Sequence, residues 1–300
     1  SVPVIIFGVI AVVLAITVPN FLSARNIVNL LIQSAAISLM AIGMAIVLIT
    51  GGIDLSMPAV MAFSGIVGAI LMRSGGSPLL ASLIMVGIGT AFGCINGLAV
   101  AYLGMIPFIV TLSMQVIITG SSILLTNARS VFGLPESFAD TVLWKIGIVP
   151  LPVFIVIMVT VFVQILMKRS ILGRWLYSTG TNADAANVAG IPVKTVVFAS
   201  YILAGFFGGF SAIIVTARLG SAAVTMGSGN VVLDIISAAV IGGVSIYGGA
   251  GTAVGAVIGA LFITFISNSM NLLHVPYYIT LLIKGFVIIG VVAIDSIRRR

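Results

Sequence analysis

The chain has 300 residues, of which 61% are hydrophobic and only 6% are charged. A soluble globular domain carries about 25% charged residues, so this composition excludes a water-soluble globular protein. The formal net charge of +7 does not indicate a nucleic-acid-binding protein, because the basic residues form short clusters and no continuous basic stripe. We therefore expect an all-α integral membrane protein, folded as a polytopic bundle of helices.

Apolar runs separated by Gly, Pro and charged residues predict about ten transmembrane helices in a single domain, residues 1–300. One helical span needs roughly 20 residues. The run at 57–72 is short enough for a re-entrant or tilted segment, so nine or eleven crossings are also compatible with the sequence. The runs lie near residues 2–18, 27–49, 57–72, 79–102, 107–125, 153–167, 196–217, 231–247, 252–273 and 279–294.

The stretch Thr50–Pro58, TGGIDLSMP, interrupts two apolar runs. Gly51 and Gly52 can adopt positive φ and end a helix. Asp54 or Ser56 can cap the next helix, whose first turn tolerates the proline. Irregular backbone survives in a membrane only where protein or a water-filled cavity covers it. Two interpretations stay open: a break that faces a translocation pathway, or a tight turn in which Asp54 is a structural cap.

Further polar residues lie inside the apolar runs. Asp234 and Lys284 are costly there, so they either pair with each other or, for Lys284, extend to the membrane surface. The neutral polar residues can hydrogen-bond an uncharged hydroxylated solute, or they can link helices. They are Asn96, Thr111, Ser113, Gln115, Asn268 and Asn271.

The polar loop 168–195 contains the signals of a short helix. Thr181 or Asn182 can cap its start, and Asp184 suits the dipole of its first turn. Gly190 can end it, and the following proline prevents its continuation. A helix of about seven residues results, roughly 10 Å long. It either lies on the membrane or docks into a groove of a soluble partner, through a small apolar surface of Ala185, Ala186, Val188 and Ala189.

Basic residues predict the orientation. Lys168, Arg169, Arg174 and Lys194 flank this loop, and three arginines end the chain. Basic clusters beside membrane spans face the cytoplasm. With an even number of spans, the loop and both termini are expected on the cytoplasmic side.

Catalysis and metal binding are not expected. His274 is the only histidine and Cys94 the only cysteine, which leaves no His/Cys metal cluster. The sequence contains no G-x-x-x-x-G-K-[ST] phosphate loop, so the chain does not bind ATP in that manner. If transport is driven by ATP, another chain has to supply the ATPase.

Four stretches, in chain order, resemble the landmarks of ribose-type sugar ABC importer permeases, within the branched-chain amino acid/ribose permease superfamily. The resemblance covers nearly the whole chain. It departs from the family after GGIDLS, where Met57-Pro58 replaces the usual Val-Gly, and at Ile235 and Ser237 in the third landmark. The stretches are GGIDLS at 51–56, LGRWLYSTGTNADAANVAGI at 172–191, LDIISAAVIGGVSIYGGAG at 233–251 and NLLHVPYYITLLIKG at 271–285.

The resemblance implies a type II ABC importer-like fold in the bacterial inner membrane. It implies a second permease subunit, identical or paralogous, and cytoplasmic ATPase subunits that bind ATP and Mg. It also implies a periplasmic sugar-binding protein that delivers ribose, xylose, galactose, allose or a furanose-like autoinducer. The departures from the family pattern leave the sugar open. No cofactor is expected in this chain itself, and its other partner is membrane lipid.

We expect three groups of site residues. Residues near the substrate pathway are Asp54, Ser56, Met57, Asn96, Phe108, Thr111, Gln115, Asn268 and Asn271, with Met57 and Phe108 as apolar gates. Residues that couple the permease to the ATPase are Gly180, Asn182, Asp184, Ala185, Ala186, Gly190 and Ile191. Structural residues are Gly51, Gly52, Asp234, Gly242, Gly243, Gly248, Gly249 and Lys284.

The hypothesis is alternating access driven by a partner ATPase, with a neutral sugar released into a cavity at the dimer interface. Two alternatives remain at this stage. One is a secondary transporter or facilitative channel that uses Asp54, Asp234 and Lys284 in an ion relay. The other is a membrane scaffold or sensor that transports nothing.

Overall fold

The structure, a computed structural model, describes residues 17–298, with side chains except at 229, 287–288 and 291–298. Its helices are α2 (Ala24–Ile49), α3 (Met57–Arg73), α4 (Pro78–Ala101), α5 (Pro107–Thr126), α6 (Glu136–Val142), α7 (Leu151–Arg169), α8 (Ile171–Thr181), α9 (Ala183–Val188), α10 (Val193–Leu219), the 3₁₀ turn η1 (Val224–Gly227), α11 (Gly229–Ile241), α12 (Ala253–Leu272) and α13 (Tyr277–Arg298). Its strands are β1 (Lys145–Ile146) and β2 (Val149–Pro150).

The polytopic membrane bundle expected from the sequence is present. In the described part of the chain, seven helices are long and apolar enough to cross a membrane. Nine of the ten apolar runs correspond to helices, whereas the run at 2–18 falls almost wholly outside the described residues, so a count of ten is not established. The run at 57–72 forms the 17-residue α3. At 1.5 Å per residue it is about 25 Å long, shorter than the roughly 30 Å hydrocarbon core of a bilayer.

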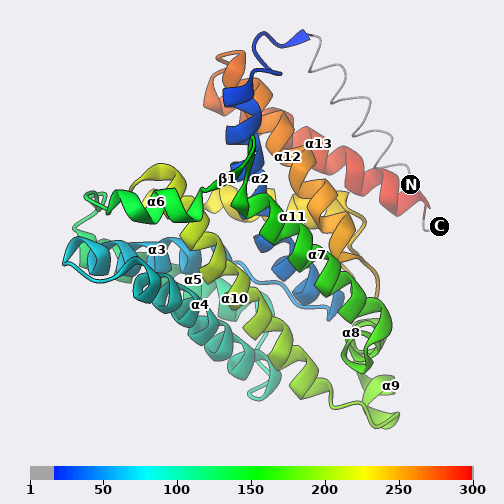
Figure 1. Ribbon diagram of the computed structural model, residues 1–300. Helices are drawn as coiled ribbons and strands as arrows, with labels where there is room; N and C mark the ends of the chain where they lie inside the picture. Colours follow the sequence, from blue (N-terminus) through cyan, green and yellow to red (C-terminus); the bar gives the residue numbers. More distant parts are fainter. Residues whose placement is uncertain (1–16, 299–300) are drawn as a thin grey trace.

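Helix α2 lies at the centre and packs against helices on both sides. Helices α3, α4, α5 and α10 form one group, and α7, α11, α12 and α13 form the other (Figure 1). The C-terminal half of α2 is almost completely buried, from Leu39 to Ile49. A helix that is apolar on all faces is expected in such a central position.

One predicted feature needed correction. The run 231–247 does not stay helical to its end, because α11 stops at Ile241 and Gly243 has a φ of +87°.

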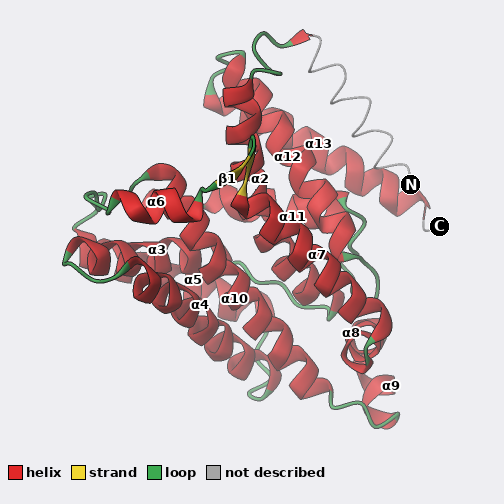
Figure 2. Cartoon of the chain, viewed as in Figure 1, coloured by secondary structure: helices red, strands yellow, loops and turns green. Residues whose placement is uncertain are grey.

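The segment between α5 and α7 contains α6 and the two-residue strands β1 and β2, the only strands in the described residues (Figure 2). Phe138, only 1% exposed, anchors α6 to the core. Helix α6 and the two strands are too short to give a clear hydrophobic period in the sequence.

Helices α4 and α10 cross with their backbones in contact. A Cβ added at Gly93 would overlap the carbonyl oxygen of Tyr201, and a Cβ added at Gly205 would overlap that of Gly89. Small residues allow this approach in a membrane, where packing drives helix association. The glycine-rich composition of these spans therefore places α10 directly on α4.

The close crossing predicts a position-specific sensitivity to side-chain size. We expect Gly93→Val to lower the free energy of unfolding by about 1–3 kcal/mol or more, the range typical of overpacking. Gly87→Val is the matched control on the same helix, since nothing lies within 4 Å of a Cβ there. Thermal unfolding of the detergent-solubilised protein measures both. Equal melting temperatures for the two variants would contradict the packing assigned to Gly93.

Candidate functional site

The break after α2 begins with a glycine turn. Gly51 has a φ of +82° and donates its amide to Leu48 O at 2.9 Å, while the Gly52 amide donates to Val47 O at 3.0 Å. These two bonds form a Schellman motif, which satisfies the carbonyl groups at the helix end. Of the two glycines, only Gly51 has positive φ. Gly52 is required for a different reason, because a Cβ there would lie 2.7 Å from the hydroxyl of Tyr201.

Asp54 caps the start of α3. Its Oδ1 accepts the amide of Ser56 at 2.9 Å and the Ser56 hydroxyl at 2.6 Å. The amide of Asn96 on α4 donates to the Ser56 hydroxyl oxygen at 2.8 Å. The Ser56 side chain makes no capping bond of its own, so of the two predicted caps Asp54 performs this role. Asp54, which is only 1% exposed, is thus held by hydrogen bonds within the bundle.

Two other helices also hold the break. The carbonyl oxygen of Ile53 accepts hydrogen bonds from the hydroxyls of Tyr201 on α10 and Thr111 on α5, both at 3.3 Å. Irregular backbone is therefore covered by protein at this point, as a low-dielectric environment requires. Sequence reasoning missed Tyr201, which is completely buried and whose polar group was the available signal.

The nine predicted pathway residues fall in three places. Asp54, Ser56, Met57, Asn96 and Thr111 come together, all buried, at the break. Phe108 and Gln115 lie on α5, where Phe108 is exposed and Gln115 is half-buried.

Asn268 and Asn271 lie on α12, away from the break. Asn268 pairs with Asn26 on α2 through two hydrogen bonds between their side-chain amides, of 3.0 and 2.8 Å, so it links helices. Asn271 is exposed near the end of α12.

An open pocket of about 210 Å³ lies beside the break. Gly51 and Gly52 line it together with Val100 at the end of α4, Pro107 at the start of α5 and Lys194 at the start of α10. None of the last three was among the predicted site residues. Only the tertiary arrangement brings these helix ends to one place.

The short helix in the polar loop is α9, and its boundaries are close to those predicted. Asn182, and not Thr181, is the cap: its side chain accepts the Ala185 amide at 2.9 Å, whereas Thr181 ends the preceding helix. Gly190 has a φ of +81°, and the Ile191 amide returns to Ala186 O at 3.0 Å. The result is a second Schellman motif.

The exposed surface of α9 differs from the predicted one in a single residue. Ala186 is only 5% exposed and faces the rest of the protein, so it does not belong to the outer surface of α9. Val188 is 90% exposed, and Ala185 and Ala189 are exposed beside it. Spacings of three and four residues place these three on one face of the helix.

Helix α8 precedes α9 and was not predicted. Its N-cap is Ser170, which accepts the Gly173 amide at 3.0 Å. Its inward residues Leu172, Leu176 and Thr179 recur every three or four positions, a period that could have identified it.

The end of α8 meets the end of α2 and the glycine-rich loop 242–252. The Gly249 amide donates to Ile49 O at 2.9 Å, and a Cβ at Gly180 would overlap that same carbonyl oxygen. The hydroxyl of Tyr177 donates to Gly251 O at 2.8 Å. Burial raises the pKa of the Tyr177 phenol, which keeps the donor protonated. Residues predicted separately as coupling and structural thus form one contact, here called the glycine junction (Gly180, Gly248, Gly249 and Ile49).

The remaining predicted structural residues also have clear positions. Lys284 on α13 binds both carboxylate oxygens of Asp234 on α11, at 2.8 and 2.9 Å. Pairing, rather than extension of Lys284 to the surface, is therefore the alternative that the structure shows. Gly242 packs on α12, since a Cβ there would overlap Gly255.

The family model "Branched-chain amino acid transport system / permease component" matches residues 26–292. The chain belongs to this permease family. Among its relatives, the D-allose transport system permease protein of Escherichia coli (strain K12) is 36% identical, over 97% of this chain and 90% of the relative. The ribose import permease protein of the same strain is 37% identical, over 93% and 88% of the two chains.

A third relative, the L-arabinose ABC transporter permease protein of Azospirillum brasilense, is 33% identical to the permease, over 99% of this chain and 87% of the relative. No solved structure matches the chain described here. This chain is a permease component of an ABC transporter, and such a component is a non-catalytic, multi-pass membrane subunit.

The cap at α3 gives a test of what Asp54 does in the permease. Asp54→Ala leaves the Ser56 amide and hydroxyl without their acceptor, and should lower the free energy of unfolding by about 1–3 kcal/mol. Asp54→Asn keeps an acceptor oxygen, so its melting temperature should lie close to that of the wild type. Asn271→Ala, at an exposed position, is the control. A large loss of stability in Asp54→Asn would show that the negative charge, and not the cap, is needed.

The glycine junction predicts linked motion of two segments. Gly180→Ala pushes α8 away from Ile49 and weakens the Gly249 hydrogen bond. Amide hydrogen exchange should then become faster both in 50–56 and in 242–252, because local opening exposes hydrogen-bonded amides. Ser178→Ala, at an exposed position of the same helix, should leave both rates unchanged. Faster exchange in only one of the segments would contradict a shared junction.

Proposed function

We propose that the permease moves a neutral monosaccharide into the cytoplasm by alternating access, driven by separate ATPase subunits. The observation that carries this proposal is α9. It is a helix capped at both ends, anchored by buried Ala186, and it presents Val188 and two alanines outward. An exposed apolar face of this kind fits a groove on a soluble partner. Since the sequence holds no phosphate loop, the partner would be the subunit that hydrolyses ATP with Mg.

A monosaccharide is the substrate class that the relatives support. They are named for D-allose, ribose and L-arabinose, at identities of 36%, 37% and 33%. These identities are nearly equal, so they favour a pentose or a hexose without selecting one. A periplasmic binding protein would supply the affinity, because the permease offers few exposed polar groups to replace the hydration of a sugar.

The outer faces of two helices support a pathway along α5. Helix α7 exposes only apolar residues until its basic end, with Gln164 half-buried. Helix α5 exposes Ser113 and Gly120 among its apolar residues, with Gln115 and Ser121 half-buried beside them. A face with small polar groups suits a hydrated sugar, and an apolar face suits lipid. We place the pathway on α5, between two permease copies or paralogues, with Phe108 as a gate at its end.

The orientation follows from the same proposal. Helix α9 and the basic residues of 168–195 would face the cytoplasm of a bacterium, and the permease would sit in its inner membrane with both termini inside. Lys194, which belongs to this loop, lines the pocket beside the break. This pocket would form part of the cytoplasmic mouth through which the sugar leaves.

The outward face of α9 gives the decisive test. Val188→Glu should prevent assembly with the ATPase and abolish ATP-dependent uptake in proteoliposomes, because it buries a charge in the proposed contact. Val188→Ala should assemble normally or nearly so. Ile148→Glu is a matched control, because it changes an apolar residue that is 68% exposed in the β1–β2 turn. Copurification with the ATPase and uptake of labelled ribose, allose and arabinose are measured together.

Two results would contradict the proposal. One is uptake that persists without any ATPase and collapses with an uncoupler, which would identify a secondary transporter. The other is full assembly and uptake with Val188→Glu, which would show that α9 is not part of the contact with the ATPase. Protein yield and monodispersity in detergent show for each variant that the membrane fold survives.

A further inference from the structure

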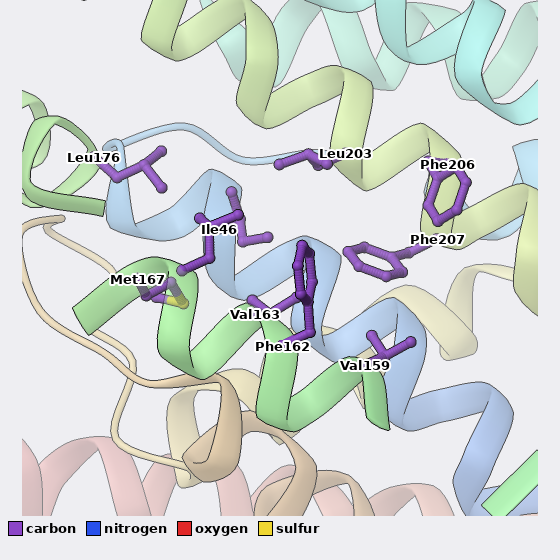
Figure 3. A pocket seen from close by; sticks show the side chains of 10 residues that line it. Ile46, Val159, Phe162, Val163, Met167, Leu176, Leu203, Phe206 and Phe207 are labelled. Atoms are coloured by element: carbon purple, nitrogen blue, oxygen red, sulfur yellow. The ribbon is translucent and has the colours of Figure 1, made fainter. Parts of the chain in front are cut away.

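A groove with an entirely apolar lining lies between α7 and α10, over the buried surface of α2. Its volume is about 370 Å³. Figure 3 shows Val159 and Phe162 of α7 facing Leu203 and Phe207 of α10 across it. At the end nearest the polar loop 168–195, Met167 closes the lining together with a residue of α8.

The lining restricts what can occupy this groove. No donor or acceptor is available there to a sugar, a nucleotide or a peptide backbone, and burial of such groups without hydrogen bonds is costly. The outer face of α7 next to the groove exposes Ile157, Met158 and Val161, so the groove continues a surface suited to lipid. A hydrocarbon chain fills such a space without leaving a polar group unpaired.

Charge indicates the kind of headgroup. Lys168 and Arg169 form the last turn of α7 and directly follow Met167 of the lining. Both are exposed, and no carboxylate among the described side chains lies within 4.0 Å of them. Basic residues at the membrane surface attract anionic headgroups, with about 1 kcal/mol for each Lys or Arg. An acyl chain in the groove would bring its headgroup to these two residues.

We propose that one anionic phospholipid binds each permease, with an acyl chain in the groove and its headgroup on Lys168 and Arg169. The site would have a structural consequence, because its two walls carry α9. Helices α7 and α8 lead into α9, and α10 follows it. A bound chain would therefore fill the space between the two supports of that helix. The proposal rests on the groove and the charges and does not depend on the proposed function.

Native mass spectrometry of the full chain, released from nanodiscs of equal phosphatidylglycerol and phosphatidylcholine, tests the site. We expect one phosphatidylglycerol to be retained per chain. The double variant Val159→Trp, Leu203→Trp fills the groove and should reduce retention at least about tenfold. Ile157→Trp places the same side chain on the outer face of the same helix and should leave retention unchanged. Equal retention in all three proteins would indicate annular lipid and overturn the proposal.

A second variant tests the headgroup even if the groove-filling protein fails to fold. Lys168→Gln with Arg169→Gln should reduce the preference for phosphatidylglycerol by about fivefold for each charge removed. Lys145→Gln, an exposed basic residue in β1, is the control and should keep the preference. An unchanged preference in the double glutamine variant would overturn the headgroup assignment.

Contact with a second copy of the chain is the competing occupant. In a Cys94→Ser background, Phe206→Cys places a single thiol at the rim of the groove. Disulfide-linked dimers in membranes would show that another permease covers the groove, and would overturn lipid binding there. Phe206→Cys chains that remain monomeric under oxidation, together with retained phosphatidylglycerol, support it.

Discussion

A backbone N–H or C=O group that lacks a partner in a bilayer costs several kcal/mol, so each interruption of a membrane helix needs partners close by. The permease interrupts its bundle at 50–56 and again at 242–252. Helices α2 and α11 end in the same way, with a glycine of positive φ and two amides that return to the last turn. After the first break, the carboxylate of Asp54 provides the acceptors for the start of α3. The polar groups of the break are thus satisfied almost entirely inside the protein.

The two interruptions are joined to each other and to the polar loop. Ile49 ends α2, and its carbonyl oxygen accepts the amide of Gly249 from the second break. The last turn of α8 lies against both, at a distance that only glycine permits at position 180. Because α9 follows α8 after one residue, a force on α9 would reach the backbone beside Asp54 through rigid contacts. This arrangement gives the proposed coupling helix a physical connection to the centre of the bundle.

Polarity divides the surface of the bundle according to its surroundings. Three ionisable side chains inside the bundle have partners: Lys284 binds Asp234 across α13 and α11, and the Ser56 hydroxyl donates to Asp54. Such pairing lowers the cost of a charge in an apolar medium. Outward faces then differ in composition, apolar on α7 and mixed on α5. We attribute the first to lipid, including the proposed acyl chain, and the second to a hydrated sugar.

The sequence by itself determined the class of the protein, most helices, and the local signals at their ends. Asn182 and Gly190 around α9, and Gly51 with Asp54 before α3, act over no more than about five residues, so their chemistry is readable from the order of the residues. The tertiary structure alone decided what joins distant segments: Asn96 with Ser56 over 40 positions, or Tyr177 with Gly251 over 74. It also turned Ala186 inward and brought Val100, Pro107 and Lys194 to one pocket. The physical reason is that such contacts depend on how whole helices pack and cross, and a glycine, an asparagine or an alanine carries the same local signal whichever neighbour it meets.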